Sequence, residues 1–160
     1  MRNLRLFFLG CLVYFLSNPG IAAAQISTVN TMQHLSFGAF TTGADGGTIT
    51  ISNEGIRSTT GTVKELGFNT SFANAIFEVF AEIDSPINIA IQDNITLQGS
   101  NGGSMSLKIG SSNKTDHFIT DIGPDIPTQI TIGGMLTVGN MSANPAGIYS
   151  GEFQITFYNE

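Results

Sequence analysis

The last fifteen residues of the chain, AGIYSGEFQITFYNE (146–160), constrain the fold more than any other stretch. Successive side chains of a β-strand point to opposite faces. One face of such a strand would carry Tyr149, Gly151, Phe153, Ile155 and Phe157, and the other Ser150, Glu152, Gln154 and Thr156. We therefore predict a half-buried strand that closes the fold, in which each large apolar side chain would stabilise the protein by about 1.5–3 kcal/mol if fully buried.

The same alternation recurs along most of the chain and predicts an all-β protein. Runs of alternating apolar residues lie at 35–39, 47–51, 75–83, 87–91, 95–97, 104–109, 118–122 and 129–138. Turn residues separate these runs, which predicts a single antiparallel, immunoglobulin-like β-sandwich of about nine strands. We expect 75–83 and 87–91 to form a hairpin around Asp84-Ser85-Pro86, and Gly133-Gly134 to mark a bulge or bend in a strand.

The first 24 residues are typical of a cleaved secretory signal peptide. Arg2 and Arg5 precede an apolar run, Leu6–Leu16, and small residues at 22–24 precede the expected cleavage after Ala24. The run is eleven residues long, whereas a membrane span needs roughly twenty, and no later stretch qualifies as a span. We therefore divide the chain into a signal peptide (1–24), a flexible N-terminal segment or edge strand (25–34) and a sandwich domain (35–160).

Charge and cysteine content restrict the possible partners. After cleavage, twelve acidic and four basic residues remain, a net charge of −8, which argues against nucleic acid and anionic membranes as partners. Cys11 lies inside the signal peptide, so the mature protein would have no disulfide in a compartment where disulfides form. Packing and backbone pairing must hold it together.

We find no pattern that predicts chemistry. His34 and His117 have no metal-ligand spacing, and no serine lies in a nucleophile elbow. The glycine pairs at 46–47, 102–103 and 133–134 lack the helix that follows a phosphate-binding loop. We therefore expect no catalytic residue, no metal, no cofactor and no enzymatic activity.

Five motifs, in this order, resemble those of the bacterial secreted domain-of-unknown-function 4402 family. They are Leu35-Ser36-Phe37-Gly38, the strand Gly47–Ile51 followed by Gly55 and Ser58, the turn Gly103-Ser104-Met105, the strand Ile132–Val138, and Gly147–Phe153. The set is fairly specific and covers nearly the whole mature chain. The family implies no catalytic activity, and its members look like pilin-type immunoglobulin-like sandwiches of Gram-negative envelopes.

The closing strand is similar to that of pilin subunits assembled by a periplasmic chaperone and an usher. Such subunits carry a glycine about fourteen residues from the end and an aromatic residue near the end. In this chain Gly147 and Tyr158 occupy the corresponding places. The chain differs from them in lacking a disulfide and in the poor apolar alternation of Gln25–His34. The resemblance implies assembly by strand addition, with Gly147, Tyr149, Gly151, Phe153, Ile155, Phe157 and Tyr158 as assembly or closing-strand residues.

Two functions follow as expectations. The first is a non-enzymatic structural or adhesive protein, a subunit of a bacterial surface fibre (fimbrium) that binds copies of itself or other envelope subunits. The second, an alternative, is a self-complete binding module, for example for glycans, with its site in the loops 41–47 and 111–116. Either protein would act in the periplasm, at the cell surface or outside the cell.

Overall fold

The computed structural model describes residues 26–67 and 71–159, so the predicted signal peptide and Gln25 lie outside the described residues. The described residues form antiparallel strands and no helix, which confirms the all-β prediction. No helix that could cross a membrane occurs among them. The strands are β1 (Ile26–Gln33), β2 (Phe40–Thr41), β3 (Gly47–Ile51), β4 (Arg57–Thr59), β5 (Lys64–Glu65), β6 (Ala75–Ala81), β7 (Pro86–Ile91), β8 (Ile95–Gly99), β9 (Ser104–Ser112), β10 (His117–Ile119), β11 (Thr128–Val138), β12 (Tyr149–Ser150) and β13 (Ile155–Tyr158).

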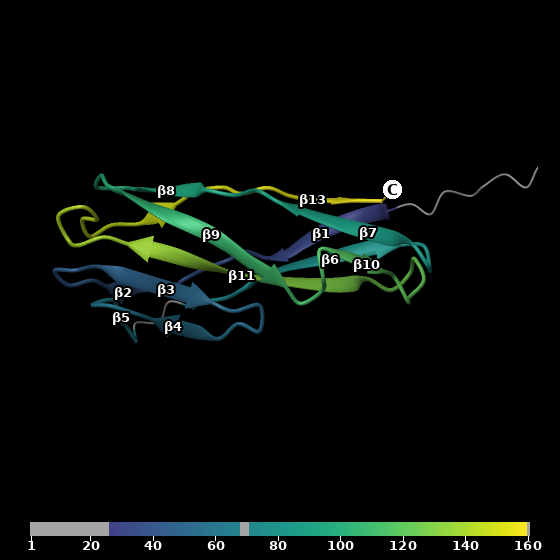
Figure 1. Cartoon of the computed structure of the whole chain (residues 1–160), viewed down its shortest axis with the longest axis horizontal. Helices are drawn as coiled ribbons and strands as arrows, with labels where there is room; N and C mark the ends of the chain where they lie inside the picture. Colours follow the sequence, from purple (N-terminus) through teal and green to yellow (C-terminus); the bar gives the residue numbers. More distant parts are fainter. Residues whose placement is uncertain (1–25, 68–70, 160) are drawn as a thin grey trace, which may run out of the picture.

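The strands pack as a sandwich along an elongated molecule (Figure 1). The larger sheet has the order β1-β6-β11-β9-β8-β12, with β3 and β4 added beside β11, and the smaller sheet has the order β10-β7-β13. Both sheets contribute to one apolar core, which includes Val79 on β6, Ile89 on β7 and Ile130 on β11. The ring of Phe77 on β6 lies 5.8 Å from that of Phe157 on β13, so side chains of the two sheets meet in the middle.

Strand β11 joins the two halves of the larger sheet. Its first part pairs with β6 and its last part with β3, while β9 runs along its other edge. The pairing with β9 shifts register between Ile132 and Gly134, which confirms the predicted bulge at the glycine pair. A side chain at Gly133 would not fit there, because its Cβ would lie 2.1 Å from the carbonyl oxygen of Ile51.

The predicted hairpin of 75–83 and 87–91 is wrong. Strand β6 pairs with β1 and β11, and β7 pairs with β10 and β13 in the other sheet. The turn between them is therefore a corner where the chain crosses from one sheet to the other, with Asp84 at φ 60°. Inward-facing residues alternate in the same way on two strands of one sheet and on two strands that face each other across a core, so alternation alone could not separate the two arrangements.

The closing stretch is two short strands rather than one. Residues 151–154 between β12 and β13 are not in a strand, opposite a similar interruption at 92–94 between β7 and β8. Gln154 and Gln92 bridge the break through a backbone and a side-chain hydrogen bond, each 3.1 Å long. The alternation holds across the break, but Phe153, Ile155 and Phe157 are half-buried, so each contributes less than full burial would give.

Two other predicted strands are shorter than expected. Residues 35–39 form a single bridge, Ser36 with Ala73, because Gly38 adopts the left-handed conformation (φ 68°) and interrupts an extended strand. The run at 118–122 becomes β10, which ends at Ile119. The N-terminal residues 26–33 form β1, which lies at one end of the larger sheet and pairs only with β6.

Candidate binding groove

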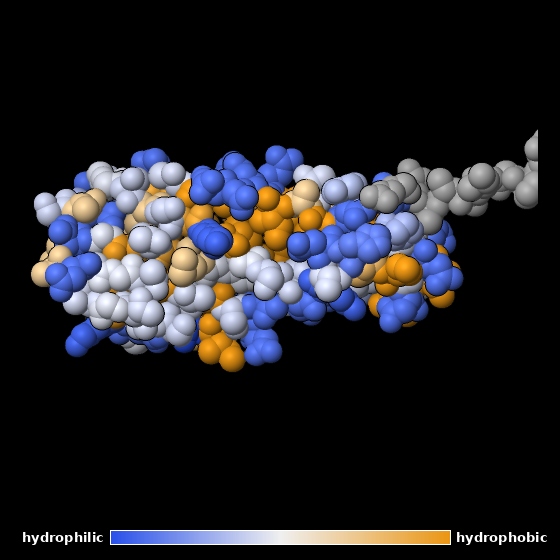
Figure 2. Space-filling model, viewed as in Figure 1, coloured by the Kyte–Doolittle hydropathy of each residue, from blue (hydrophilic) through white to orange (hydrophobic). Residues whose placement is uncertain are grey.

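An apolar groove of about 630 Å³ opens between segments from the two ends of the chain. Residues 35–42 form one side, which we call the N-terminal wall, and residues 146–153 form the other, which we call the C-terminal wall. Figure 2 shows apolar surface gathered in the middle of one face, where the chain between β12 and β13 passes in Figure 1. A second, shallower hollow of about 290 Å³ lies beside Gln92 and Gln154.

The floor of the groove is the inner face of the larger sheet. It consists of side chains that alternate inward on three neighbouring strands, namely Leu97 (β8), Met105 and Leu107 (β9), and Leu136 and Val138 (β11). All five belong to the buried core. The groove therefore reaches down to the core of the sandwich between its two walls.

The N-terminal wall is held from behind, on the side away from the groove. Ser36 exchanges two backbone hydrogen bonds of 2.8 Å with Ala73, and β2 pairs with β5. At the far end of the wall, the Thr42 hydroxyl donates to the carbonyl oxygen of Gly139 over 3.0 Å. The backbone of this wall is thus engaged largely by β4, β5 and the segment before β6.

The C-terminal wall is paired on one side only. Strand β12 pairs with β8, the Ser100 amide donates to the Ile148 carbonyl over 2.9 Å, and the Tyr149 hydroxyl donates to the Pro145 carbonyl over 2.7 Å. Beyond β12, no backbone hydrogen bond within the described part of the chain involves 151–153. This wall therefore presents unpaired backbone N–H and C=O groups beside an apolar floor.

The two walls approach each other at one end of the groove. Strand β1, which leads into the N-terminal wall, lies beside β13, which continues the C-terminal wall, but the two strands do not pair. The two chain ends thus lie side by side at β1 and β13 without backbone pairing between them.

The groove has no charge. None of its lining residues is acidic or basic, because Glu152 of the C-terminal wall is exposed to solvent and does not line the groove. Burying a charge against this lining would be costly, so the groove fits an uncharged occupant that turns apolar groups toward the floor. Among the residues that the structure describes, no group of three or more His, Cys, Asp and Glu could hold a metal ion.

The residues singled out from the sequence divide between the groove and the core. Gly147, Tyr149, Gly151 and Phe153 line the groove. Ile155 and Phe157 lie on β13 and pack against the core, and Tyr158 is largely exposed. The sequence analysis did not identify Met141 and Ile148, which line the groove while 65% and 77% exposed. Of the N-terminal wall it assigned only residues 41 and 42 to a site, as part of the loop 41–47. Apolar residues in a loop are a weak signal, because scattered exposed apolar residues are common.

The two loops considered for ligand binding do not form one site. In the first, Gly46 packs against Val138 at the end of β11. In the second, Asn113 accepts a hydrogen bond from the Thr131 amide over 2.8 Å. The two loops are thus anchored at Val138 and Thr131, which lie seven residues apart on β11. In an extended strand this spacing corresponds to about 23 Å.

Comparison with known proteins gives a family. Residues 26–158 match the family described as "Domain of unknown function (DUF4402)". A search of curated proteins and a search of solved structures found no match. The match covers the groove, both of its walls and nearly every described residue. The chain therefore belongs to the DUF4402 family.

Proposed function

We propose that this protein is a non-enzymatic, secreted subunit of a bacterial surface fibre, which joins its neighbours by accepting an extended strand in the groove. The observation that carries the proposal is the combination of an apolar floor with an unpaired backbone at 151–153. A peptide strand meets both requirements, because its backbone pairs with the open edge while alternate side chains fill the hollow.

The unpaired backbone is what favours a strand over a lipid or another small apolar ligand. The volume of about 630 Å³ suits a small molecule as well, since ligand pockets span about 300–1,000 Å³. An acyl chain, however, would cover the backbone groups of the C-terminal wall without supplying hydrogen bonds, and an unmade backbone hydrogen bond away from water is costly.

As the donor we propose residues 25–34 of a second copy, the segment that forms β1. Six of the eight residues of β1 are exposed, and none is charged. Detaching it from β6 would lose mainly ladder hydrogen bonds, some of which the groove edge would replace. Ile26 and Met32, which share one face of an extended strand, would become more buried in the groove than they are on β6.

The route to the surface is part of the same proposal. Residues 1–24 would direct secretion through the inner membrane and be removed, which leaves the donor segment at the start of the mature chain. A periplasmic chaperone would cover the groove before assembly, and an usher would exchange that cover for the next subunit. The self-complete binding module remains the alternative if the mature protein does not assemble.

The test is the self-association of residues 25–160, measured by size-exclusion chromatography with light scattering over a range of concentrations. The variant Ile148→Asp places a charge at the groove, and Ile126→Asp is the matched control, since both side chains are largely exposed and Ile126 lies outside the groove. We expect concentration-dependent oligomers for the unmodified protein and the control, and at least about a tenfold weaker association for Ile148→Asp, because burying one charge costs more than 1.4 kcal/mol.

A mixing experiment separates donor from acceptor. Met32→Asp should prevent residues 25–34 from acting as the donor strand and leave the groove intact, whereas Ile148→Asp does the reverse. Each variant alone should stay monomeric, while an equal mixture should stop at dimers, because each pair keeps one intact donor and one intact groove. Strict monomers of the unmodified protein, or equal loss in the Ile126→Asp control, would contradict the proposal.

A further inference from the structure

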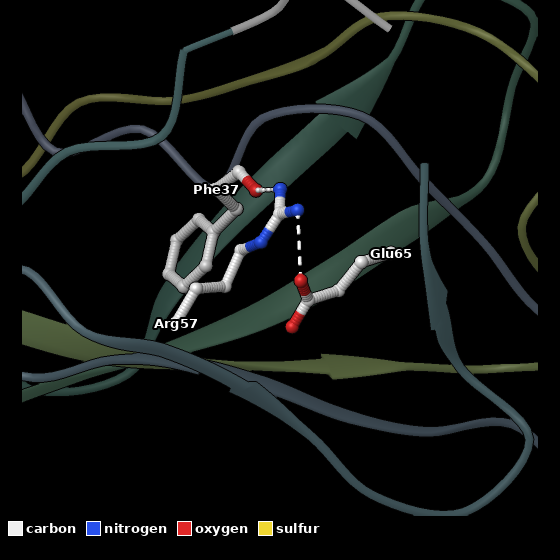
Figure 3. Close-up of polar contacts among 3 residues, drawn as sticks. All are labelled: Phe37, Arg57 and Glu65. Atoms are coloured by element: carbon white, nitrogen blue, oxygen red, sulfur yellow. Dashed lines mark hydrogen bonds and ion pairs between the residues drawn. The ribbon is translucent and has the colours of Figure 1, made fainter. Parts of the chain in front are cut away.

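Arg57 on β4 lies behind the N-terminal wall, where its guanidinium group binds three neighbours. Nη2 lies 2.9 Å from the Glu65 carboxylate, and Nη1 donates to the carbonyl oxygen of Phe37 over 3.2 Å (Figure 3). The guanidinium carbon is 4.3 Å from the centre of the Phe72 ring. Figure 3 shows the guanidinium between the wall residue Phe37 and Glu65 on β5.

This arginine is unusually placed for a charged residue. Its side chain is only 7% exposed, and its Nε is buried without a hydrogen-bond partner. The pair with Glu65 is the only ion pair found within residues 26–67 and 71–159. Burying a guanidinium is costly even when it is paired, and apolar side chains often fill such a place with no loss of stability. The fold retains a charge here despite that cost.

Arg57 binds the backbone of a residue that lines the groove. The Phe37 side chain lines the groove and is 8% exposed. The preceding residue, Ser36, is tied to Ala73, but the following residue, Gly38, has a left-handed φ of 68° and makes no hydrogen bond within the described residues. Within the described part of the chain, the bond from Arg57 is the only hydrogen bond that Phe37 and Gly38 make.

We infer that Arg57 is a positioning residue for strand docking, which fixes the N-terminal wall in the conformation that accepts the incoming strand. This inference rests on the function proposed above. A wall that is already in place does not have to be ordered when the strand enters, so less conformational entropy is lost on binding. Arg57 does not contact the groove itself and acts through Phe37.

The test compares Arg57→Lys with the unmodified mature protein by hydrogen–deuterium exchange and by light scattering. Lysine keeps the charge but is a point donor without the planar fork that reaches both Phe37 and Glu65. We expect amide exchange in 35–42 to become at least about tenfold faster and self-association to weaken at least about tenfold. Exchange in β9 and β11 should stay unchanged, which distinguishes loosening of the wall from general destabilisation.

If Arg57→Lys does not fold, the double variant Arg57→Met with Glu65→Met is used for the same two measurements. It replaces the buried pair by apolar side chains, which commonly preserves stability, but it also removes the bond to Phe37, so the same faster exchange in 35–42 is expected. Unchanged exchange and unchanged association in folded variants would overturn the inference. If the unmodified protein proves monomeric, the strand-docking function fails, whereas faster exchange confined to 35–42 would still support the role of Arg57 in holding the wall.

Discussion

At the scale of single residues, one tight constraint on the fold is a position that has no room for a side chain. Gly133 lies where β11 passes from β6 to β3, and its backbone packs directly against the carbonyl oxygen of Ile51. Paired glycines inside a strand pattern predicted a bulge here. The neighbour that requires the glycine lies more than eighty residues earlier in the chain, so only the folded structure identifies it.

Gly133→Ala is therefore expected to destabilise the protein by about 1–3 kcal/mol or more, since the added Cβ would force backbone apart. Gly123→Ala is the matched control, because nothing lies within 4 Å of the position of its Cβ, and its effect should stay within about 1 kcal/mol. Urea unfolding followed by circular dichroism measures both. Equal losses for the two variants would show that the contact with Ile51 relaxes without cost.

At the scale of elements, the corner between β6 and β7 is held by one buried threonine. The Thr120 hydroxyl donates to the Glu82 carbonyl over 2.6 Å and accepts from the Ser85 amide over 2.9 Å. Its own amide and carbonyl bond Ser85 and Asp84. Thr120 is 2% exposed, so these polar groups have no access to water, and together they direct β7 into the second sheet.

Thr120→Val keeps the shape of the side chain and removes the hydroxyl. We expect a loss of about 1–3 kcal/mol in the free energy of unfolding, because the Ser85 amide and the Glu82 carbonyl lose a buried partner. Thr137→Val, at an exposed position on β11, should change stability by no more than about 0.5 kcal/mol. A fall of similar size in both variants would mean that the hydroxyl does not hold the corner.

At the scale of the whole molecule, the groove is assembled from the two ends of the chain. Its walls, 35–42 and 146–153, are separated by more than one hundred residues in sequence. The groove carries no charge, whereas mature copies would each carry a net charge of −8. Association through the groove would therefore bring together molecules that repel one another at long range.

Salt should consequently strengthen self-association of residues 25–160. Raising the ionic strength from about 0.01 M to about 0.15 M shortens the Debye length from about 30 Å to about 8 Å and screens this repulsion. We expect the concentration at which oligomers form to fall several-fold, as measured by light scattering. Association that weakens with salt would instead indicate that unlike charges join the copies, which an uncharged groove cannot explain.

The sequence by itself determined that the protein is all-β and which residues within most strands face the core, although Ile83, expected to face inward, lies past the end of β6 and is exposed. Alternation is a local property, because each side chain of a strand faces one side or the other whatever the partner strand. Leu107, Ile130 and Phe153 were thus placed correctly. Only the tertiary structure decided that β6 and β7 belong to different sheets, that Arg57 holds Phe37, and that 35–42 faces 146–153 across an open groove. Each of these depends on contacts between distant parts of the chain, which a local pattern does not record.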